Sequence, residues 1–355
     1  MKQRLLALDA IKGLAILMVV MGNIYVFVDD DSFALPSYVE NFIGGLQIPL
    51  FILVAGIFSQ RKLTSLAEYK SYFKDKIIRL LIPAFLFFSL FTLWHNGKVH
   101  LSGIYTYQYW FTINLFLYFS IFTVQRACID WIAACLTKRD NKIINLWLHL
   151  VFAVLVYYLS VDLLPQIYPP IENYFVVVVL RRRIAWYYPY LVLGFLIGHF
   201  NLINVFQKHR VAAIAFIFFC LGLCFIGGLQ GLEGGIPSYA WNNIYRIIVP
   251  AFFILCIYVF SSWEKLGGKV FKVFVLMGQW SLPIYLVHYF FIPRISFLAD
   301  YINSIDAHLI GSELLIYFGG AVLTLVPTLA VVWCIKLNPY LDFFLFGEKH
   351  RLLKK

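Results

Sequence analysis

Charged residues are scarce in this sequence and make up only 13% of its 355 residues. Soluble globular domains typically carry about 25%. Hydrophobic residues reach 62%, which is more apolar surface than a water-soluble core can hide. The composition therefore excludes a soluble globular protein and predicts a chain whose solvent is lipid.

Cysteines and long polar segments are also few. The six cysteines include no Cys-x-x-Cys pair, and no histidine stands beside them at metal-ligand spacing. No polar stretch exceeds about 20 residues, and no internal repeat is visible. We therefore expect a single transmembrane domain over residues 1–355, with no metal and no disulfide framework. The first apolar run lacks a small-residue cleavage site, which predicts a retained helix rather than a signal peptide.

Apolar runs, in contrast, are abundant. Each is long enough to cross the roughly 30 Å hydrocarbon layer as a helix. We predict an all-α integral membrane protein, a single bundle of about ten transmembrane helices. The predicted segments are residues 8–28, 40–58, 77–95, 109–134, 145–163, 184–200, 210–228, 244–262, 270–292 and 312–336.

Positive charge is distributed unevenly over the connections between these segments. The first connection holds three aspartates at 29–31, whereas the second holds six Lys and Arg residues between 61 and 79. Because basic loops stay in the cytoplasm, both termini are predicted to be cytoplasmic. The net charge of +11 then indicates a lipid bilayer as partner rather than nucleic acid. The oligomeric state is left open.

The first segment carries a family signature. Residues 8–23 read LDAIKGLAILMVVMGN. This stretch resembles the opening signature of the acyltransferase 3 family, Leu-Asp-x-x-(Arg/Lys)-Gly-x-x-x-x-x-Val-Val-x-Gly-His. Every signature position matches except the last, where Asn23 replaces the family's histidine. The signature has Lys12 rather than arginine before Gly13, and in this it most resembles the bacterial branch of fucose 4-O-acetylases.

Five further stretches resemble motifs of the same family, in the same order. They are QIPLFILVAG at 47–56, KIIRLLIP at 76–83, YWF at 109–111, YPYLVLG at 188–194 and GQWSLPIYLVH at 278–288. The resemblance implies transfer of an acyl group, usually acetyl from cytoplasmic acetyl-CoA, to a hydroxyl of a sugar or cell-envelope glycan. It also implies a multi-pass protein of the bacterial inner membrane.

Asn23 is the departure that matters for catalysis. The family's histidine is usually proposed to deprotonate the acceptor hydroxyl, and asparagine cannot accept a proton. Asn23 has three possible explanations. It is an inactivating change that was introduced, the chain is a naturally inactive relative, or the chain is an active enzyme that uses another base. The intact flanking motif favours the first, which predicts a catalytically impaired chain. His288 is the next candidate for the base, although a histidine in an apolar helix is more often a packing residue.

Asp9, Lys12 and Asn23 share one face of the first segment, and Lys12 and Asn23 are roughly 16 Å apart along the helix axis. Ionisable residues inside a membrane are functional candidates. We assign Asp9 to catalysis and Lys12 to the donor phosphates, with Lys76 and Arg79 as further phosphate contacts. The alternatives are an interfacial Asp9–Lys12 ion pair, and Lys76 and Arg79 as positive-inside anchors.

The remaining candidates are expected to bind the acceptor. An arginine cluster falls in the fifth connection, which the predicted topology places outside. It suits binding of a phosphate or carboxylate of the acceptor, a place in the inner pathway beside the donor, or contact with lipid phosphates. Two other functions stay open, namely a non-catalytic CoA- or glycan-binding member, and a transporter or flippase, which should show inverted repeats with paired broken helices. The acceptor candidates are Gln47, Trp110, Arg181, Arg182, Arg183 and Tyr285.

Overall fold

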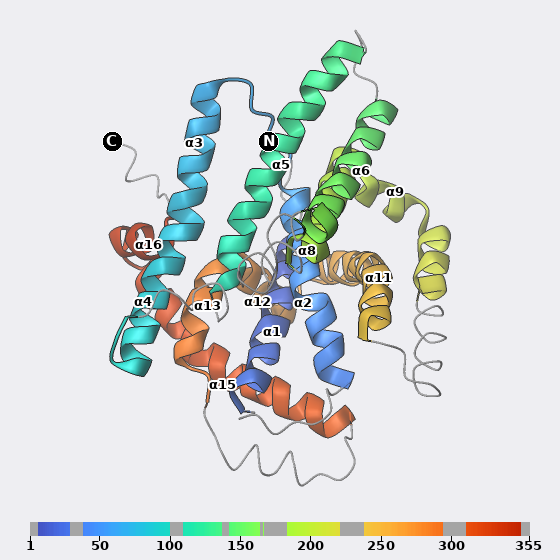
Figure 1. Ribbon diagram of the computed structural model, residues 1–355. Coiled ribbons are helices and arrows are strands. Elements are labelled where there is room, and N and C mark those ends of the chain that lie inside the picture. Colours follow the sequence, from blue (N-terminus) through green and yellow to red (C-terminus); the bar gives the residue numbers. More distant parts are fainter. Residues whose placement is uncertain are drawn as a thin grey trace. The chain divides into compact units, whose positions relative to one another are not determined.

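The computed structural model describes residues 6–28, 38–99, 109–136, 142–163, 166, 183–220, 238–293 and 310–348. Every regular element in these ranges is a helix (Figure 1). The elements are α1 (Leu6–Val28), α2 (Tyr38–Ile57), α3 (Leu66–Lys76), η1 (Ile77–Leu81), α4 (Ile82–Asn96), α5 (Trp110–Leu136), α6 (Lys142–Tyr158), η3 (Leu159–Leu163), α8 (Ala185–His199), α9 (Leu202–Lys208), the helix Arg210–Cys220, α11 (Ser238–Leu266), α12 (Lys269–Gln279), α13 (Ser281–Val287), η5 (His288–Phe290), α15 (Ile310–Lys336) and α16 (Pro339–Phe346).

Among these described helices, six are long and apolar enough to cross a membrane. The number rises to eight if two bent pairs, α8 with α9 and α12 with α13, each count as one span. The predicted class, an all-α membrane protein, is confirmed. The total of ten spans and the cytoplasmic position of both termini stay predictions.

The chain divides into two compact units. Unit 1 consists of Met1–Val54 and Asn201–Trp333, and unit 2 of Ala55–Phe200 and Cys334–Lys355.

Unit 1 is built around the packing of α1 against α12. A Cβ atom on Gly13 would lie 1.9 Å from the carbonyl oxygen of Phe274, and one on Gly278 would lie 1.7 Å from that of Asp9. Small residues at a membrane helix interface let two backbones approach closely. Gly13 of the signature and Gly278 of the last motif thus both lie in the close contact between α1 and α12.

The predicted continuous helix 270–292 is wrong, because α12 and α13 meet at Trp280 with a bend of 71°. Pro283 follows three residues later and has no N–H for the carbonyl of residue 279, so an unbroken helix cannot keep its hydrogen bonds there. The short α13 is buried from Pro283 to Val287, and the chain continues into the single turn η5, which begins at His288.

Unit 2 contains a helical run that begins earlier than predicted. The predicted segment 77–95 starts in the structure at Leu66, and α3, η1 and α4 continue one another to Asn96. Ser65 caps this run, and Glu68 bonds back to the Ser65 backbone, which together form a capping box. The chain takes the wider π turn of η1 just before Pro83, whose missing N–H would interrupt an ordinary α-helix.

A buried polar network joins α5, α6 and α8 within unit 2. The Tyr188 hydroxyl donates to Gln125 Oε1, and Gln125 Nε2 lies 3.0 Å from His149 Nδ1. Polar side chains buried in a membrane protein are satisfied by one another, as here. The network therefore fixes how these three helices pack.

Candidate functional site

The central feature of unit 1 is a hydrogen bond between Asn23 and His288. Asn23 Nδ2 lies 3.0 Å from His288 Nε2, although 265 residues separate the two along the chain. His288 is fully buried. Its other ring nitrogen, Nδ1, lies 3.1 Å from the carbonyl oxygen of Ile284 and 2.8 Å from that of Tyr285.

We assign the tautomer of the imidazole from these partners. Both contacts of Nδ1 are carbonyl oxygens, which only accept, so Nδ1 carries the hydrogen. Nε2 then holds the lone pair and accepts the hydrogen bond from the Asn23 amide. The basic atom of His288 therefore faces the position at which the first-segment signature ends.

Gln47 of α2 lies beside Gly22 of α1. Its side-chain oxygen would be 2.8 Å from a Cβ on Gly22, the residue before Asn23, so Gly22 leaves the room that Gln47 occupies. Within the described part of the chain, Gln47 Oε1 is buried and has no hydrogen-bond partner. A buried acceptor without a donor is costly and suits a site that receives a hydroxyl group.

Asp9 and Lys12 form an ion pair with Nζ 2.9 Å from Oδ1. The Asp9 side chain is fully buried, and that of Lys12 is 18% exposed. The pair that the sequence left as an alternative is therefore present. The Asp9 carboxylate balances the charge of Lys12 at the α1–α12 contact, where Gly278 meets the Asp9 backbone.

The other predicted residue near His288 is Tyr285. Its ring centroid is 5.9 Å from that of His288, and the ring of Tyr289 is closer, at 3.9 Å. The backbone carbonyl of Tyr285, rather than its side chain, orients the imidazole.

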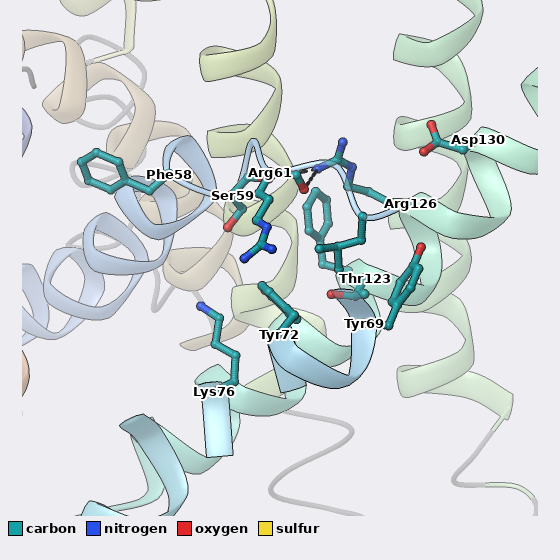
Figure 2. Close-up of a pocket in the computed structure, with 11 residues that line it drawn as sticks. Phe58, Ser59, Arg61, Tyr69, Tyr72, Lys76, Thr123, Arg126 and Asp130 are labelled. Atoms are coloured by element: carbon teal, nitrogen blue, oxygen red, sulfur yellow. Dashed lines mark hydrogen bonds between the residues drawn. The ribbon is translucent and has the colours of Figure 1, made fainter. Parts of the chain in front are cut away.

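Unit 2 holds an open pocket between the loop after α2, α3 and α5 (Figure 2). Lys76 is one of its lining residues, and its ammonium lies 3.4 Å from the centroid of the Phe119 ring. Arg79 lies one turn further on, is exposed, and does not line the pocket. The lining residues are Phe58, Ser59, Arg61, Leu63, Tyr69, Tyr72, Lys76, Phe122, Thr123, Arg126 and Asp130.

Arg126 is a pocket residue that the sequence analysis did not select. Its Nη1 atom donates to the carbonyl oxygens of Ser59, at 3.2 Å, and Arg61, at 2.9 Å. Its guanidinium also lies 4.9 Å from the Phe195 ring. An arginine inside an apolar predicted segment was a signal that could have found it.

Two of the predicted acceptor residues are brought together in unit 2. The guanidinium carbon of Arg183 lies 4.0 Å from the centroid of the Trp110 ring, which is stacking distance. The Arg183 carbonyl also accepts a hydrogen bond from Tyr118. Arg181 and Arg182 lie outside the described residues.

Comparison with known protein families gives a match over most of the chain. The model of the acyltransferase 3 family, described as an acyltransferase domain, matches residues 5–336. No curated protein and no solved structure matches. The matched range includes every site residue described above.

Proposed function

Because the chain belongs to the acyltransferase 3 family, we propose that it moves an acetyl group from cytoplasmic acetyl-CoA to a hydroxyl of a sugar or cell-envelope glycan. We place it in the bacterial inner membrane. The observation that carries the proposal is the Asn23–His288 hydrogen bond, which presents a basic nitrogen at the position where the family has its histidine.

In this proposal His288 is the general base. An acceptor hydroxyl takes the place of the Asn23 amide at Nε2 and gives its proton to the ring. The hydroxyl oxygen then bonds to the acyl carbon, the carbon–sulfur bond of the thioester breaks, and the imidazolium returns the proton to the leaving sulfur. The Ile284 and Tyr285 carbonyls hold Nδ1–H throughout, so the ring keeps its orientation.

Asn23 and Gln47 position the acceptor. The Asn23 amide is displaced from Nε2 and is then free to donate to the hydroxyl oxygen or to the acyl carbonyl. Gln47 Oε1 is available to accept from a neighbouring hydroxyl of the sugar. This arrangement favours the third explanation for Asn23, an active enzyme with another base, over an inactivating substitution.

The test compares acetyl transfer by the present chain with that by a His288→Gln variant. Both are incubated with acetyl-CoA and a panel of glycan acceptors, and CoA release and acetylated product are measured. We expect product from the present chain only. Binding of CoA without product on any acceptor would favour the non-catalytic alternative, and movement of unmodified glycan across vesicles would favour the flippase.

A further inference from the structure

Three cations converge on the pocket of unit 2. Arg61 comes from the loop after α2, Lys76 from α3 and Arg126 from α5. Figure 2 shows the Arg61 guanidinium and the Lys76 ammonium directed into the same space. The pocket's one carboxylate, Asp130, already pairs at 3.6 Å with the exposed Lys62. Like charges held together repel, so this arrangement is favourable when an anion fills the space.

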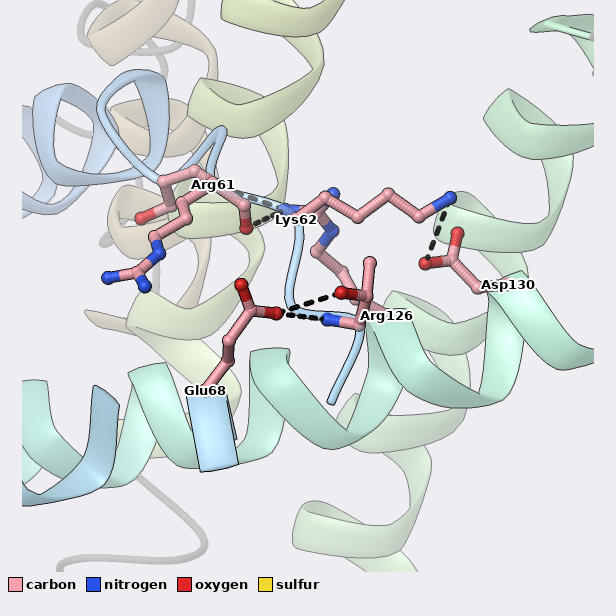
Figure 3. A network of polar contacts seen from close by, with 7 residues as sticks. Arg61, Lys62, Glu68, Arg126 and Asp130 are labelled. Carbon is pink, nitrogen blue, oxygen red and sulfur yellow. Dashed lines mark hydrogen bonds and ion pairs between the residues drawn. The ribbon is translucent and has the colours of Figure 1, made fainter. Parts of the chain in front are cut away.

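The pocket is also held in shape without a ligand. Arg126 clamps the loop through the carbonyls of Ser59 and Arg61, and Figure 3 shows the contact with Arg61. The capping box at Ser65 and Glu68 fixes the far end of the same loop. A preformed site does not lose binding energy in ordering its own residues. The clamp uses the backbone of Arg61 and leaves its guanidinium for the pocket.

Aromatic rings complete the lining. Tyr69, Tyr72 and Phe122 face the same pocket as the three cations. Lys76 lies over the Phe119 ring at 3.4 Å and at 5.3 Å from the Tyr72 ring centroid, and such rings stabilise the ammonium without neutralising its charge. Cations beside planar rings suit a ligand that combines phosphate with a flat base.

We infer that this pocket binds the phosphate-bearing nucleotide part of the acyl-CoA donor. Arg61, Lys76 and Arg126 hold the phosphates, and the tyrosines pack against the base. The inference rests on the proposed function for its donor, and it assigns the phosphate contacts to Arg61 and Arg126 in place of Arg79. The same phosphate chemistry is carried by an anionic lipid headgroup, which the experiment separates from the nucleotide.

The experiment uses the full chain in nanodiscs of neutral phosphatidylcholine, with binding of CoA and of pantetheine measured by calorimetry. Arg61→Gln removes a pocket charge and keeps the backbone clamp, and Arg126→Gln removes both. Lys70→Gln is the matched control, because Lys70 lies on α3, is exposed and does not line the pocket. Thermal unfolding of each variant checks the fold.

We expect each pocket variant to bind CoA about tenfold to a hundredfold more weakly, the usual effect of losing one charged hydrogen bond. Lys70→Gln should stay within about twofold. Pantetheine, which lacks the nucleotide and all its phosphates, should bind weakly and equally to all proteins. Equal CoA affinity in Arg61→Gln and the present chain, both folded, overturns the inference.

Two further outcomes separate the pocket from the proposed function. If CoA binds as expected but no acetyl transfer occurs on any acceptor, the pocket assignment stands and the proposed function falls. If transfer occurs and the KM for acetyl-CoA is unchanged in Arg61→Gln, the function stands and the pocket assignment falls. The pocket is assigned to a lipid headgroup, and the inference is overturned, by a third result. In it the chain loses CoA binding in nanodiscs of phosphatidylglycerol, and the variants bind CoA as the present chain does in neutral lipid.

Discussion

Replacing His288 by Gln tests the catalytic pair directly. Glutamine is polar and of similar length, so it can still accept the Asn23 amide hydrogen, but it cannot take a proton. A positioned general base contributes about 10² to 10⁴ in rate. We therefore predict a fall in kcat of that size, with CoA affinity unchanged because the substitution lies outside the pocket of unit 2.

Asn23→Ala should have a much smaller effect. The Asn23–His288 contact is one neutral hydrogen bond of 3.0 Å, and losing such a bond costs about 0.5 to 1.5 kcal/mol, or about two- to twelvefold in rate. If Asn23 acts through His288, the double variant should be no slower than His288→Gln alone. Non-additivity of this kind distinguishes positioning from an independent role.

The assay is single-turnover acetyl transfer with saturating acetyl-CoA, so that chemistry rather than product release is measured. Two results would contradict the assignment of His288 as the general base. One is a His288→Gln variant within tenfold of the present chain. The other is an Asn23→His variant at least a hundredfold faster than the present chain, because that gain would show that the base had been missing.

Three other predictions concern folding and topology. Gly278→Ala should lower the unfolding temperature strongly, because its Cβ would lie 1.7 Å from the Asp9 carbonyl oxygen. Gly319→Ala is the control and should leave the unfolding temperature unchanged, because no atom lies within 4 Å of a Cβ there. Equal melting curves for the two variants would contradict the close contact. Lys12→Ala should destabilise the protein by about 3 to 5 kcal/mol, because it breaks the ion pair with the buried Asp9 carboxylate. Asp9→Asn in the same chain should recover much of the loss, and a Lys12→Ala variant as stable as the present chain would disprove this. A thiol label at position 98 should react from outside intact cells and one at position 70 should not, and the reverse pattern would invert the predicted topology.

Apolar length alone was enough to place most of the helices. It could not show the break at Trp280, because Pro283 lies inside a run that is apolar on both sides. It also hid the true start of α3, whose eleven residues are too polar for a membrane segment. The capping pattern of Ser65 and Glu68 was the local signal for that start.

The candidate site was predictable residue by residue but not as a pair. Asn23 stood out because it departs from a signature, and His288 because it ends a motif. That their side chains meet depends on how α1 docks against α12 and on the bend at Trp280, and a single sequence contains no measure of either. The Arg126 clamp was hidden for a related reason, since its partners are backbone carbonyls, which every residue has.

The glycine contact between α1 and α12 also limits how this sequence can change in length. Asn23 lies ten positions after Gly13, and His288 lies ten positions after Gly278. Inserting or deleting one residue in the first interval would turn Asn23 by about 100° around the α1 axis and away from the imidazole. Natural relatives should therefore vary in side chains between Gly13 and position 23 but not in the number of residues, whereas the loops between helices are free to lengthen.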